Sequence, residues 1–455
     1  MASMRILLRP TLMLACLLAF TVADAGVLRS DGGAFVDAGN GTVVLRGFNL
    51  SQHHKFPPFR PNTDPALFTR LTAAGINVVR HQFNWEAFEP EPGVHDESYL
   101  DHYAGVTERA AAAGLYVIVD IHQDAFSRWT LDGCGEGFPR WAIPAGFAQD
   151  EPDNGLKCYA WPLRVMWHRA RYEQLFNDFY TPGNPARERY LLMLERIAQR
   201  LAGQPNVVGY EPINEPLGDG RLLMAFYADA IEVVRRHDPT AIAFLTPEIF
   251  TGLGTEATTL PIPPFGNVAF APHYYDPPVY AYLWFGRRYE PVAANNRAVA
   301  QRWNAALLLG EFGAPPSPLT RRYLRMIYDD LDAHGDSATQ WAYTPEWTPA
   351  RLDGWNYEDL SVVDDQGQWR GNYTPRPYAA RTAGAYGHLV VDTEARRAAY
   401  TWQHDPGRGA TEIRLPPGMT PKIDATGADC RWQAERRLVS CTASAAGDAR
   451  VTITW

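Results

Sequence analysis

The stretch NVVGYEPINEPL, residues 206–217, decides the fold that the sequence predicts. Residues 207–210 form a short apolar run, which predicts a buried strand, and Asn214, Glu215 and Pro216 follow it. A proline at this place breaks the strand and fixes the turn. In a barrel of parallel strands, a carboxylate just beyond the carboxyl end of a strand faces the functional site. Glu215 is therefore the first candidate for a functional residue.

The same pattern recurs further along the chain, where the apolar run 307–310 leads into Glu311. Two carboxylates on one rim of a barrel are what double-displacement glycoside hydrolysis requires. One acts as acid and base, and the other acts as nucleophile. The alternative is that two surface glutamates follow strands by chance, and the shared context of Glu215 and Glu311 argues against it.

The rest of the chain repeats a rhythm of strand, helix, glycine and strand. This alternation predicts eight apolar strands with helices between them, which is the number and order of elements in a (β/α)8 TIM barrel. The expected strands are residues 42–50, 76–80, 115–121, 207–210, 241–245, 268–271, 307–310 and 337–341. The expected helices are residues 66–74, 101–113, 187–201, 222–236, 296–306 and 319–333. A doubly wound sheet is the structural alternative, but no glycine-rich phosphate loop follows the first strand.

Two segments are too long to be simple connections. Residues 124 to about 180 are rich in aromatic side chains and show little helical periodicity, and residues 277–291 are a second aromatic segment. Long barrel loops of this kind usually shape a site. The alternative is a long surface loop without a functional role, which packs on its own aromatic side chains.

Both ends of the chain differ in texture from the predicted barrel. Residues 1–25 have a basic start, an apolar run and a small-residue cleavage site, so they predict a signal peptide cut near Ala25 and Gly26 and a secreted protein. After residue 380, alternating short runs between turns predict a small antiparallel β-sandwich. We therefore expect a catalytic barrel over residues 26–380 and an accessory sandwich over residues 381–455.

The overall composition limits the partners. The net charge of −9 includes no block of like charge, which argues against a nucleic acid or an anionic membrane surface as partner. We expect a monomer that needs no cofactor and no metal.

Four cysteines remain after the predicted signal peptide, and four cysteines allow three connectivities. The pairs Cys134–Cys158 and Cys430–Cys441 are favoured because each closes a short loop, and an exported chain can keep such bonds. A zinc site is the weaker interpretation because neither pair has close ligand spacing.

Polar and aromatic residues gather at the ends of the predicted strands. Arginine or a tyrosine hydroxyl can keep a nucleophilic carboxylate ionised. An asparagine can bond the sugar 2-hydroxyl, and a tryptophan can lie under the sugar ring. Each residue alone could be structural, but their joint placement is hard to explain by packing. The set comprises Arg80, His122, Asn214, Glu215, His273, Tyr275, Glu311 and Trp341.

Over roughly residues 40–375 this set resembles glycoside hydrolase family 5. The sequence Asn-Glu-Pro at 214–216 is similar to the acid/base motif of that family, and Glu311 is similar to its nucleophile. The other six residues match the remaining family positions. The resemblance implies a retaining hydrolase with substrate-binding roles for these six residues.

Within the family, the chain resembles endoglycoceramidases, which cut the bond between glycan and ceramide in glycosphingolipids. The similarity lies in the sequence VDIHQD at 119–124, in the loop that contains His53, His54 and Lys55, and in the trailing β-sandwich. It implies that Lys55 and Asp124 bond hydroxyls of the sugar next to the cut. A salt bridge within the loop is the alternative for these two residues. The aromatic segments would suit a groove for two lipid chains, with transient contact to a lipid surface.

Two other functions compete with this hypothesis. A family 5 endoglucanase or another β-glycanase acting on polysaccharide would need spaced tryptophans and polar groups on the leaving side, where a ceramide groove needs a continuous apolar lining. A noncatalytic protein that binds glycan or lipid would be expected to have lost one of the two glutamates, and both are present.

Overall fold

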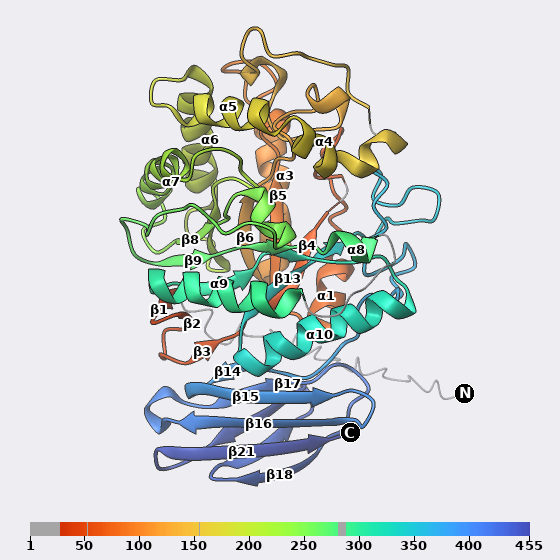
Figure 1. Ribbon diagram of the computed structural model, residues 1–455. Coiled ribbons are helices and arrows are strands. Elements are labelled where there is room, and N and C mark those ends of the chain that lie inside the picture. The colour runs from red at the N-terminus through yellow and green to blue at the C-terminus, as the bar shows by residue number, and fades with distance from the viewer. Residues whose placement is uncertain (1–27, 52, 154, 281–287) are drawn as a thin grey trace, which may run out of the picture.

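The computed structural model describes residues 28–51, 53–153, 155–280 and 288–455. Eight parallel strands close into a barrel in the order β11-β13-β4-β5-β6-β7-β8-β9 (Figure 1). These strands are β4 (Arg46–Leu50), β5 (Val78–Phe83), β6 (Tyr116–Ile121), β7 (Val207–Glu211), β8 (Ile242–Leu245), β9 (Val268–Phe270), β11 (Ala306–Leu309) and β13 (Ser337–Tyr343). The prediction of a (β/α)8 barrel is confirmed. A two-stranded parallel ladder, β10 (His273–Tyr274) with β12 (Glu311–Phe312), extends it at the functional end.

Helices surround the strands of the barrel (Figure 1). They are α1 (Pro65–Ala73), α2 (Trp85–Phe88), α3 (Glu97–Ala112), α4 (Trp161–Trp167), α5 (Arg169–Tyr180), α6 (Pro185–Leu201), α7 (Gly220–Arg235), α8 (Pro277–Tyr280), α9 (Tyr289–Trp303) and α10 (Pro318–His334). Six of them follow an Asp, Asn or Ser side chain that accepts a hydrogen bond from a backbone N–H of the first turn. Such caps explain where these helices begin.

The expectation of little helical structure in residues 124–180 is wrong. Besides α4 and α5, the segment contains the 3-10 turns η1 (Leu131–Gly133), η2 (Arg140–Ala142) and η3 (Leu156–Ala160). Helix α5 buries Tyr172, Leu175, Phe176, Phe179 and Tyr180. This spacing places the five side chains on one helical face, so tertiary burial stabilises the helix. In the second aromatic segment, residues 281–287 lie outside the described part of the chain.

The inside of the barrel has two layers. The lower layer is apolar and includes Val78 and Ile118, and Phe35 from the N-terminal strand β2 (Ala34–Val36) packs into it. Arg80 and Asp120 lie two residues further along the same strands as Val78 and Ile118, so their side chains point to the same interior. Because buried polar groups need partners, this upper layer is where a network of polar contacts is required.

Two antiparallel sheets accompany the barrel, and most of their strands follow it in the chain, as predicted. The first has the order β1-β2-β3-β14-β17-β20-β19 and the second β15-β16-β21-β18. The strands not yet given are β1 (Arg29–Asp31), β3 (Thr42–Val43), β14 (Tyr378–Thr382), β15 (Gly384–Asp392), β16 (Arg397–His404), β17 (Thr411–Arg414), β18 (Lys422–Thr426), β19 (Asp429–Gln433), β20 (Leu438–Thr442) and β21 (Gly447–Thr454). A short 3-10 turn, η5 (Pro406–Arg408), precedes β17.

The expected single strand over residues 42–50 is wrong. The chain forms β3, which pairs with β14 of the C-terminal sheet, and then β4 in the barrel. The three N-terminal strands therefore belong to the same sheet as β14, although residues 26–380 were expected to form the barrel alone. The division at residue 380 stays a prediction, because β14 spans it.

The C-terminal sheets are fixed to the barrel, and both predicted disulfides form. Tyr386 of β15 donates a hydrogen bond to the carbonyl of Asp332 at 2.7 Å, and Tyr378 of β14 donates one to the carbonyl of Gly75 at 2.8 Å. The two disulfide bonds join Cys134 to Cys158 and Cys430 to Cys441, with S–S distances of 2.00 and 2.03 Å. Within the described ranges, no helix combines the length and apolar character needed to cross a bilayer.

Candidate active site

Arg80 organises the polar layer of the barrel. Its guanidinium donates two hydrogen bonds of 2.7 Å to the oxygens of Glu211 and lies 3.0 Å from Oδ1 of Asp120. It also donates to the amide oxygens of Asn49 and Asn214 at 2.8 and 2.7 Å. Burial acts to lower the pKa of Arg80, but Asp120 and Glu211 raise it well above its ordinary value. A permanent and fully buried positive charge therefore stands at the centre of the site.

Glu311 lies in β12, directly after the seventh strand of the barrel. Its Oε1 accepts a 2.8 Å hydrogen bond from Nη1 of Arg80, and its Oε2 accepts one of 2.8 Å from the hydroxyl of Tyr275. Charge-assisted hydrogen bonds of this kind are short and directional. Both oxygens of Glu311 are therefore held in fixed positions by donors that stabilise a carboxylate.

Glu215 follows β7 on a backbone turn that needs a positive φ of 38°. The side chain of Gln123 holds this turn by donating to the carbonyls of Asn214 and Glu215, at 2.5 and 3.1 Å. Oε1 of Glu215 shares a 2.9 Å hydrogen bond with Nδ1 of His273. Burial, together with the nearby charge of Asp124, raises the pKa of Glu215 to about 8. This shift favours the protonated form of the carboxyl group at neutral pH.

The two glutamates face each other across His273. Nδ1 of His273 is 2.9 Å from Glu215 Oε1 and 3.6 Å from Glu311 Oε2, and a carboxylate oxygen of each glutamate lies within 4.8 Å of the other. Burial lowers the pKa of His273, which favours the neutral ring. The site thus pairs a carboxyl group of raised pKa with a second glutamate that accepts hydrogen bonds from Arg80 and Tyr275, at short range. This is the arrangement that acid-assisted displacement at a single carbon atom requires.

A second cluster lies beside the glutamates. Lys55 Nζ is 2.6 Å from Asp124 Oδ2, and it lies over the rings of Trp341 and Trp355 at 4.4 and 4.2 Å from their centroids. The ring of His122 stacks on Trp341 with centroids 5.6 Å apart. These contacts form a wall in which an aromatic face and several hydrogen-bonding groups lie together.

All ten residues predicted to act in catalysis or substrate binding lie in this one connected network. They are Lys55, Arg80, His122, Asp124, Asn214, Glu215, His273, Tyr275, Glu311 and Trp341. Lys55 and Asp124 also form the loop ion pair that was the alternative for them, and a partner in an ion pair can still bond a sugar.

The sequence analysis missed several members of the network. Asp120 and Glu211 bind Arg80 from inside buried strands, and a charged residue within an apolar strand is a signal that could have found them. Trp355 and Glu136 come from long loops, where no local pattern marks them. Their positions depend on how those loops fold over the barrel.

Two groups in the site have the residue types of a metal centre, namely Glu215 with His273 and Glu311, and His122 with Asp124 and Glu136. Each already contains a buried protein cation. Arg80 binds Glu311 in the first, and Lys55 binds Asp124 in the second. A further positive charge would be repelled at either place, so the geometry favours a polar organic substrate.

Comparisons with known proteins agree with this chemistry. The family description Cellulase (glycosyl hydrolase family 5) matches residues 36–346. Endoglycoceramidase I of Rhodococcus hoagii (strain 103S) is 26% identical over 463 residues, which cover 94% of this chain and 88% of the relative. The predicted similarity to endoglycoceramidases is confirmed.

Solved structures show the same similarity. A structure of endo-glycoceramidase II from Rhodococcus sp., described as a lactosyl-enzyme intermediate, has a TM-score of 0.74 and 25% identity, and the match covers 92% of this chain and 98% of that chain. Sterylglucosidase 1 of Cryptococcus neoformans shares the fold, with a TM-score of 0.75, 15% identity and coverage of 94% and 97%. Because the family match spans more than half of the chain and its barrel holds the paired glutamates, this protein is a glycoside hydrolase that belongs to glycosyl hydrolase family 5.

Proposed function

We propose that this enzyme hydrolyses the bond between the glycan and the ceramide of glycosphingolipids. The observation that carries the proposal is the similarity to endoglycoceramidases over nearly the whole chain, C-terminal sheets included. A match limited to the barrel would be equally compatible with a polysaccharide hydrolase. The described site supplies the chemistry that such a cleavage needs.

The reaction proceeds with retention of the anomeric configuration. Glu311 is the nucleophile, since Arg80 and Tyr275 donate hydrogen bonds to its two oxygens and so favour a carboxylate in a fixed orientation. Glu215 is the acid and then the base, which the raised pKa of about 8 supports. Carboxylate oxygens within 4.8 Å of each other support the close spacing of retaining enzymes, where about 5–5.5 Å separates the carboxyl groups, rather than the wider spacing of inverting ones.

The neighbouring groups bind the sugar. Asn214 is placed between Arg80 and Asp124, where its amide can meet the 2-hydroxyl next to Glu215. Trp341 lies under the sugar ring, and Lys55, His122 and Asp124 bond hydroxyls along its edge. Their burial and mutual contacts support fixed positions for these groups.

Transient contact with a lipid surface is part of the proposal. Of the nine large hydrophobic side chains exposed in the described part of the chain, four lie at helical spacing on η3 and α4. They are Tyr159, Leu163, Met166 and Trp167, and Trp167 is 76% exposed. The inner end of α4 reaches the site, because the ring of Trp161 lies 6.1 Å from that of Trp355. This stripe, defined by the four exposed residues, is suited to the surface of a bilayer in which glycolipid substrate is embedded.

The stripe can be tested with paired substrates. Changing Leu163 and Trp167 together to serine should reduce cleavage of glycolipid in vesicles and leave cleavage of a soluble aryl glycoside unchanged. Leu192→Ser is the matched control, because Leu192 is 49% exposed but lies on α6. Equal activity of the double variant and the control on vesicles would exclude this contact.

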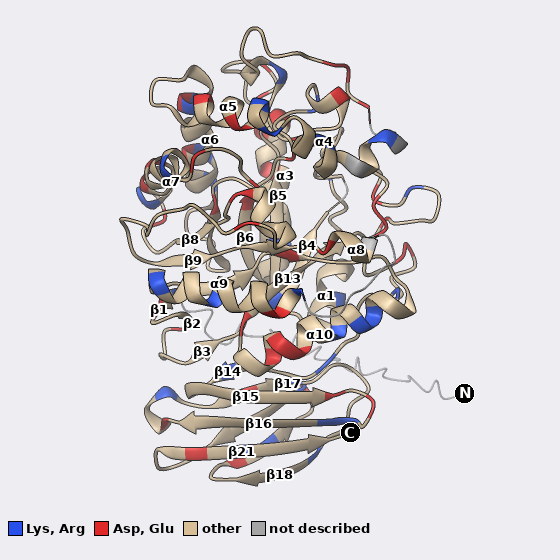
Figure 2. Cartoon of the chain, viewed as in Figure 1, with Lys and Arg blue, Asp and Glu red and all other residues tan. Residues whose placement is uncertain are grey.

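Secretion and a monomeric state complete the proposal. Residues 1–25 carry the features of a signal peptide, and they lie outside the described residues. In Figure 2 the segments coloured for Lys and Arg and those coloured for Asp and Glu are interspersed along the chain of the barrel, which argues against a nucleic acid as partner. The mature protein should begin at Gly26, which intact mass would show.

The substrate is tested by a panel of glycosphingolipids and β-glucans, with the released sugar identified by mass spectrometry. We expect intact oligosaccharide and free ceramide from the glycosphingolipids. Release of sugar from the glucans alone would make the enzyme a β-glycanase instead.

A further inference from the structure

Glu136 is a buried carboxyl group that none of the proposed catalytic steps uses. It belongs to the long segment after β6, in the sequence Cys134-Gly135-Glu136-Gly137, and its exposed fraction is 0%. Its backbone pairs with that of Asp124 through two hydrogen bonds of 3.1 and 2.7 Å. The hairpin thus places Glu136 directly beside a residue of the sugar-binding cluster.

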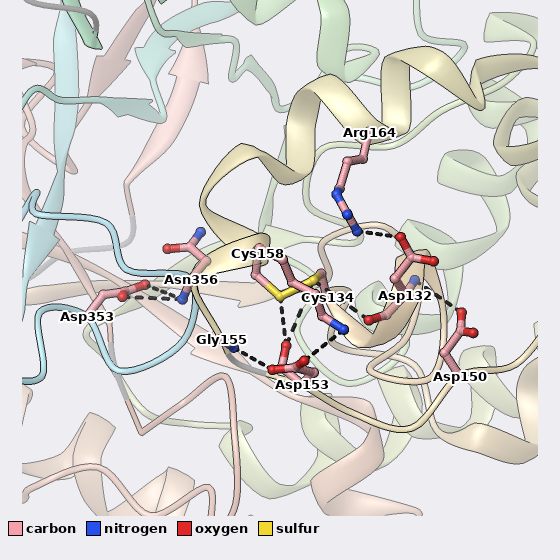
Figure 3. Close-up of a disulfide and its surroundings, with 10 residues drawn as sticks. Asp132, Cys134, Asp150, Asp153, Gly155, Cys158, Arg164, Asp353 and Asn356 are labelled. Carbon is pink, nitrogen blue, oxygen red and sulfur yellow. Dashed lines mark hydrogen bonds and ion pairs between the residues drawn. A yellow bond between two sulfur atoms is a disulfide. The ribbon is translucent and has the colours of Figure 1, made fainter.

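The hairpin has little freedom to move. A Cβ at Gly135 would lie 2.2 Å from the carbonyl oxygen of Ser127, and one at Gly137 would lie 2.6 Å from Cα of Gln123. The disulfide Cys134–Cys158 ties it to η3, and an ion pair from Arg164 of α4 to Asp132 fastens the turn in front of it (Figure 3). The backbone therefore holds Glu136 at a fixed place.

The two oxygens of Glu136 have different surroundings. Oε2 accepts a 3.0 Å hydrogen bond from the amide of Asn84. Oε1 makes no hydrogen bond within the described residues, and it lies 3.4 Å from Nε2 of His122 and 3.7 Å from Nζ of Lys55. One oxygen is anchored, and the other stands between two of the groups assigned to the sugar.

The contacts of His122 and Lys55 explain why a third partner matters. Nδ1 of His122 is bound to Asp120 at 2.7 Å, so Nε2 is the nitrogen left to face Glu136 and the substrate. Lys55 has one close carboxylate, Asp124, and a lysine side chain can rotate about a single ion pair. Oε1 of Glu136 is a second oxygen near Nζ, at 3.7 Å, and it limits that rotation. Burial raises the pKa of Glu136 to about 8. Whether this carboxyl group is ionised or protonated, it keeps an oxygen that can accept a hydrogen bond from Nε2 of His122 or from Nζ of Lys55.

We infer that Glu136 is a positioning residue, which aligns Nε2 of His122 and Nζ of Lys55 for hydrogen bonds to the hydroxyls of the bound sugar. The inference rests on the proposed function insofar as Lys55, His122 and Asp124 are taken to bind sugar. Glu136 itself is fully buried, and the inferred role requires no contact of its own with the sugar.

The test asks whether the effect of changing Glu136 depends on the presence of individual sugar hydroxyls. Initial rates are measured for an activated aryl β-glycoside and its monodeoxy analogues, with wild-type enzyme and Glu136→Gln. For the parent glycoside we expect KM to rise about tenfold in the variant, the effect of one weakened hydrogen bond to a charged group, with a smaller change in kcat. For at least one deoxy analogue the variant and the wild type should be nearly equal, because the misaligned bond is already missing. The same loss of kcat/KM on every analogue would overturn the inference.

One control and one replacement variant make the result decisive. Glu86→Gln changes another buried carboxyl group that packs on the same hairpin, through a backbone hydrogen bond to Gly137, but binds Arg128 instead. It should lose no selectivity among the analogues. If Glu136→Gln fails to fold, Asn84→Ser is used. Asn84→Ser removes the amide that anchors Oε2 and keeps a residue suited to cap α2. Unchanged selectivity in Asn84→Ser would then count against the inference.

The result is independent of the lipid substrate. If wild-type enzyme cleaves the aryl glycoside but no glycosphingolipid, the proposed function fails and the role of Glu136 is still measured. If glycosphingolipid is cleaved and the deoxy analogues show no coupling, only the role of Glu136 fails.

Discussion

The protonation of Glu215 gives the most specific prediction, because it ties a structural feature to a measurable pH. Burial and the charge of Asp124 raise the pKa of this carboxyl group from an ordinary 4.5 to about 8. Such a displacement favours the protonated form by roughly 5 kcal/mol relative to a glutamate in water. An acid catalyst must carry its proton when the substrate binds, so activity is retained below pH 8 and lost above it.

The expected profile follows from this pKa. For wild-type enzyme on an aryl glycoside with a poor leaving group, kcat/KM should be level up to about pH 7 and should fall about tenfold per pH unit above pH 8. At pH 9 about one tenth of the enzyme keeps the proton. In Glu215→Ala with an activated leaving group and added azide, the alkaline fall should disappear, because departure of that group needs no acid.

The measurement on Glu215→Ala is needed to assign the alkaline fall in activity to Glu215. Burial also raises the pKa of Glu136 and Glu358 to about 8, so the wild-type profile alone does not identify the group. If Glu215→Ala kept the same alkaline fall, another group would be responsible and the acid role of Glu215 would be refuted.

Three further predictions address the nucleophile, its hydrogen bond and the stability of the fold. With azide, Glu215→Ala should release a β-glycosyl azide and Glu311→Ala the α-anomer, and opposite anomers by NMR would exchange the two roles. Tyr275→Phe removes a hydrogen bond to the carboxylate of Glu311, so kcat/KM should fall roughly 10- to 100-fold with little change in melting temperature. An unchanged kcat/KM would show that Arg80 alone is enough to orient Glu311. Burial lowers the pKa of His54 from 6.5 to about 3, so the unfolded chain binds more protons between these values, and the free energy of unfolding should fall by about 1.4 kcal/mol per pH unit on acidification. Urea unfolding between pH 4 and 6 should show a shallower pH dependence in His54→Gln, and an equal slope would contradict the burial of a neutral ring.

The barrel and the meeting of the ten predicted site residues could be predicted because the signals are local. An apolar run in the sequence indicates each strand, and Glu215 and Glu311 follow shortly after two of these runs. In a closed parallel barrel, the ends of all strands meet on one rim. Residues far apart in the sequence therefore come together without any need to predict a long-range contact.

Apart from Asp120 and Glu211, which lie as charged residues within apolar strands, the failures concern contacts with no local signal. The apolar run 42–50 serves two sheets, since Thr42 pairs with Thr382 while Arg46 pairs with Ala338. Nothing in the run itself marks the change. Glu136 was missed for the same reason, because a glutamate between two glycines in a loop becomes part of the site only when the hairpin packs on Asp124.

The central claim is that Glu311 attacks the anomeric carbon and forms a covalent glycosyl-enzyme. It is tested most directly by inactivating the enzyme with a 2-deoxy-2-fluoro aryl β-glycoside, digesting the protein and locating the added sugar by mass spectrometry. The account predicts one sugar per chain, attached to Glu311, and no labelling of Glu311→Gln. Attachment of the sugar to Glu215, or turnover of the probe to an inverted product without any labelled peptide, would contradict it.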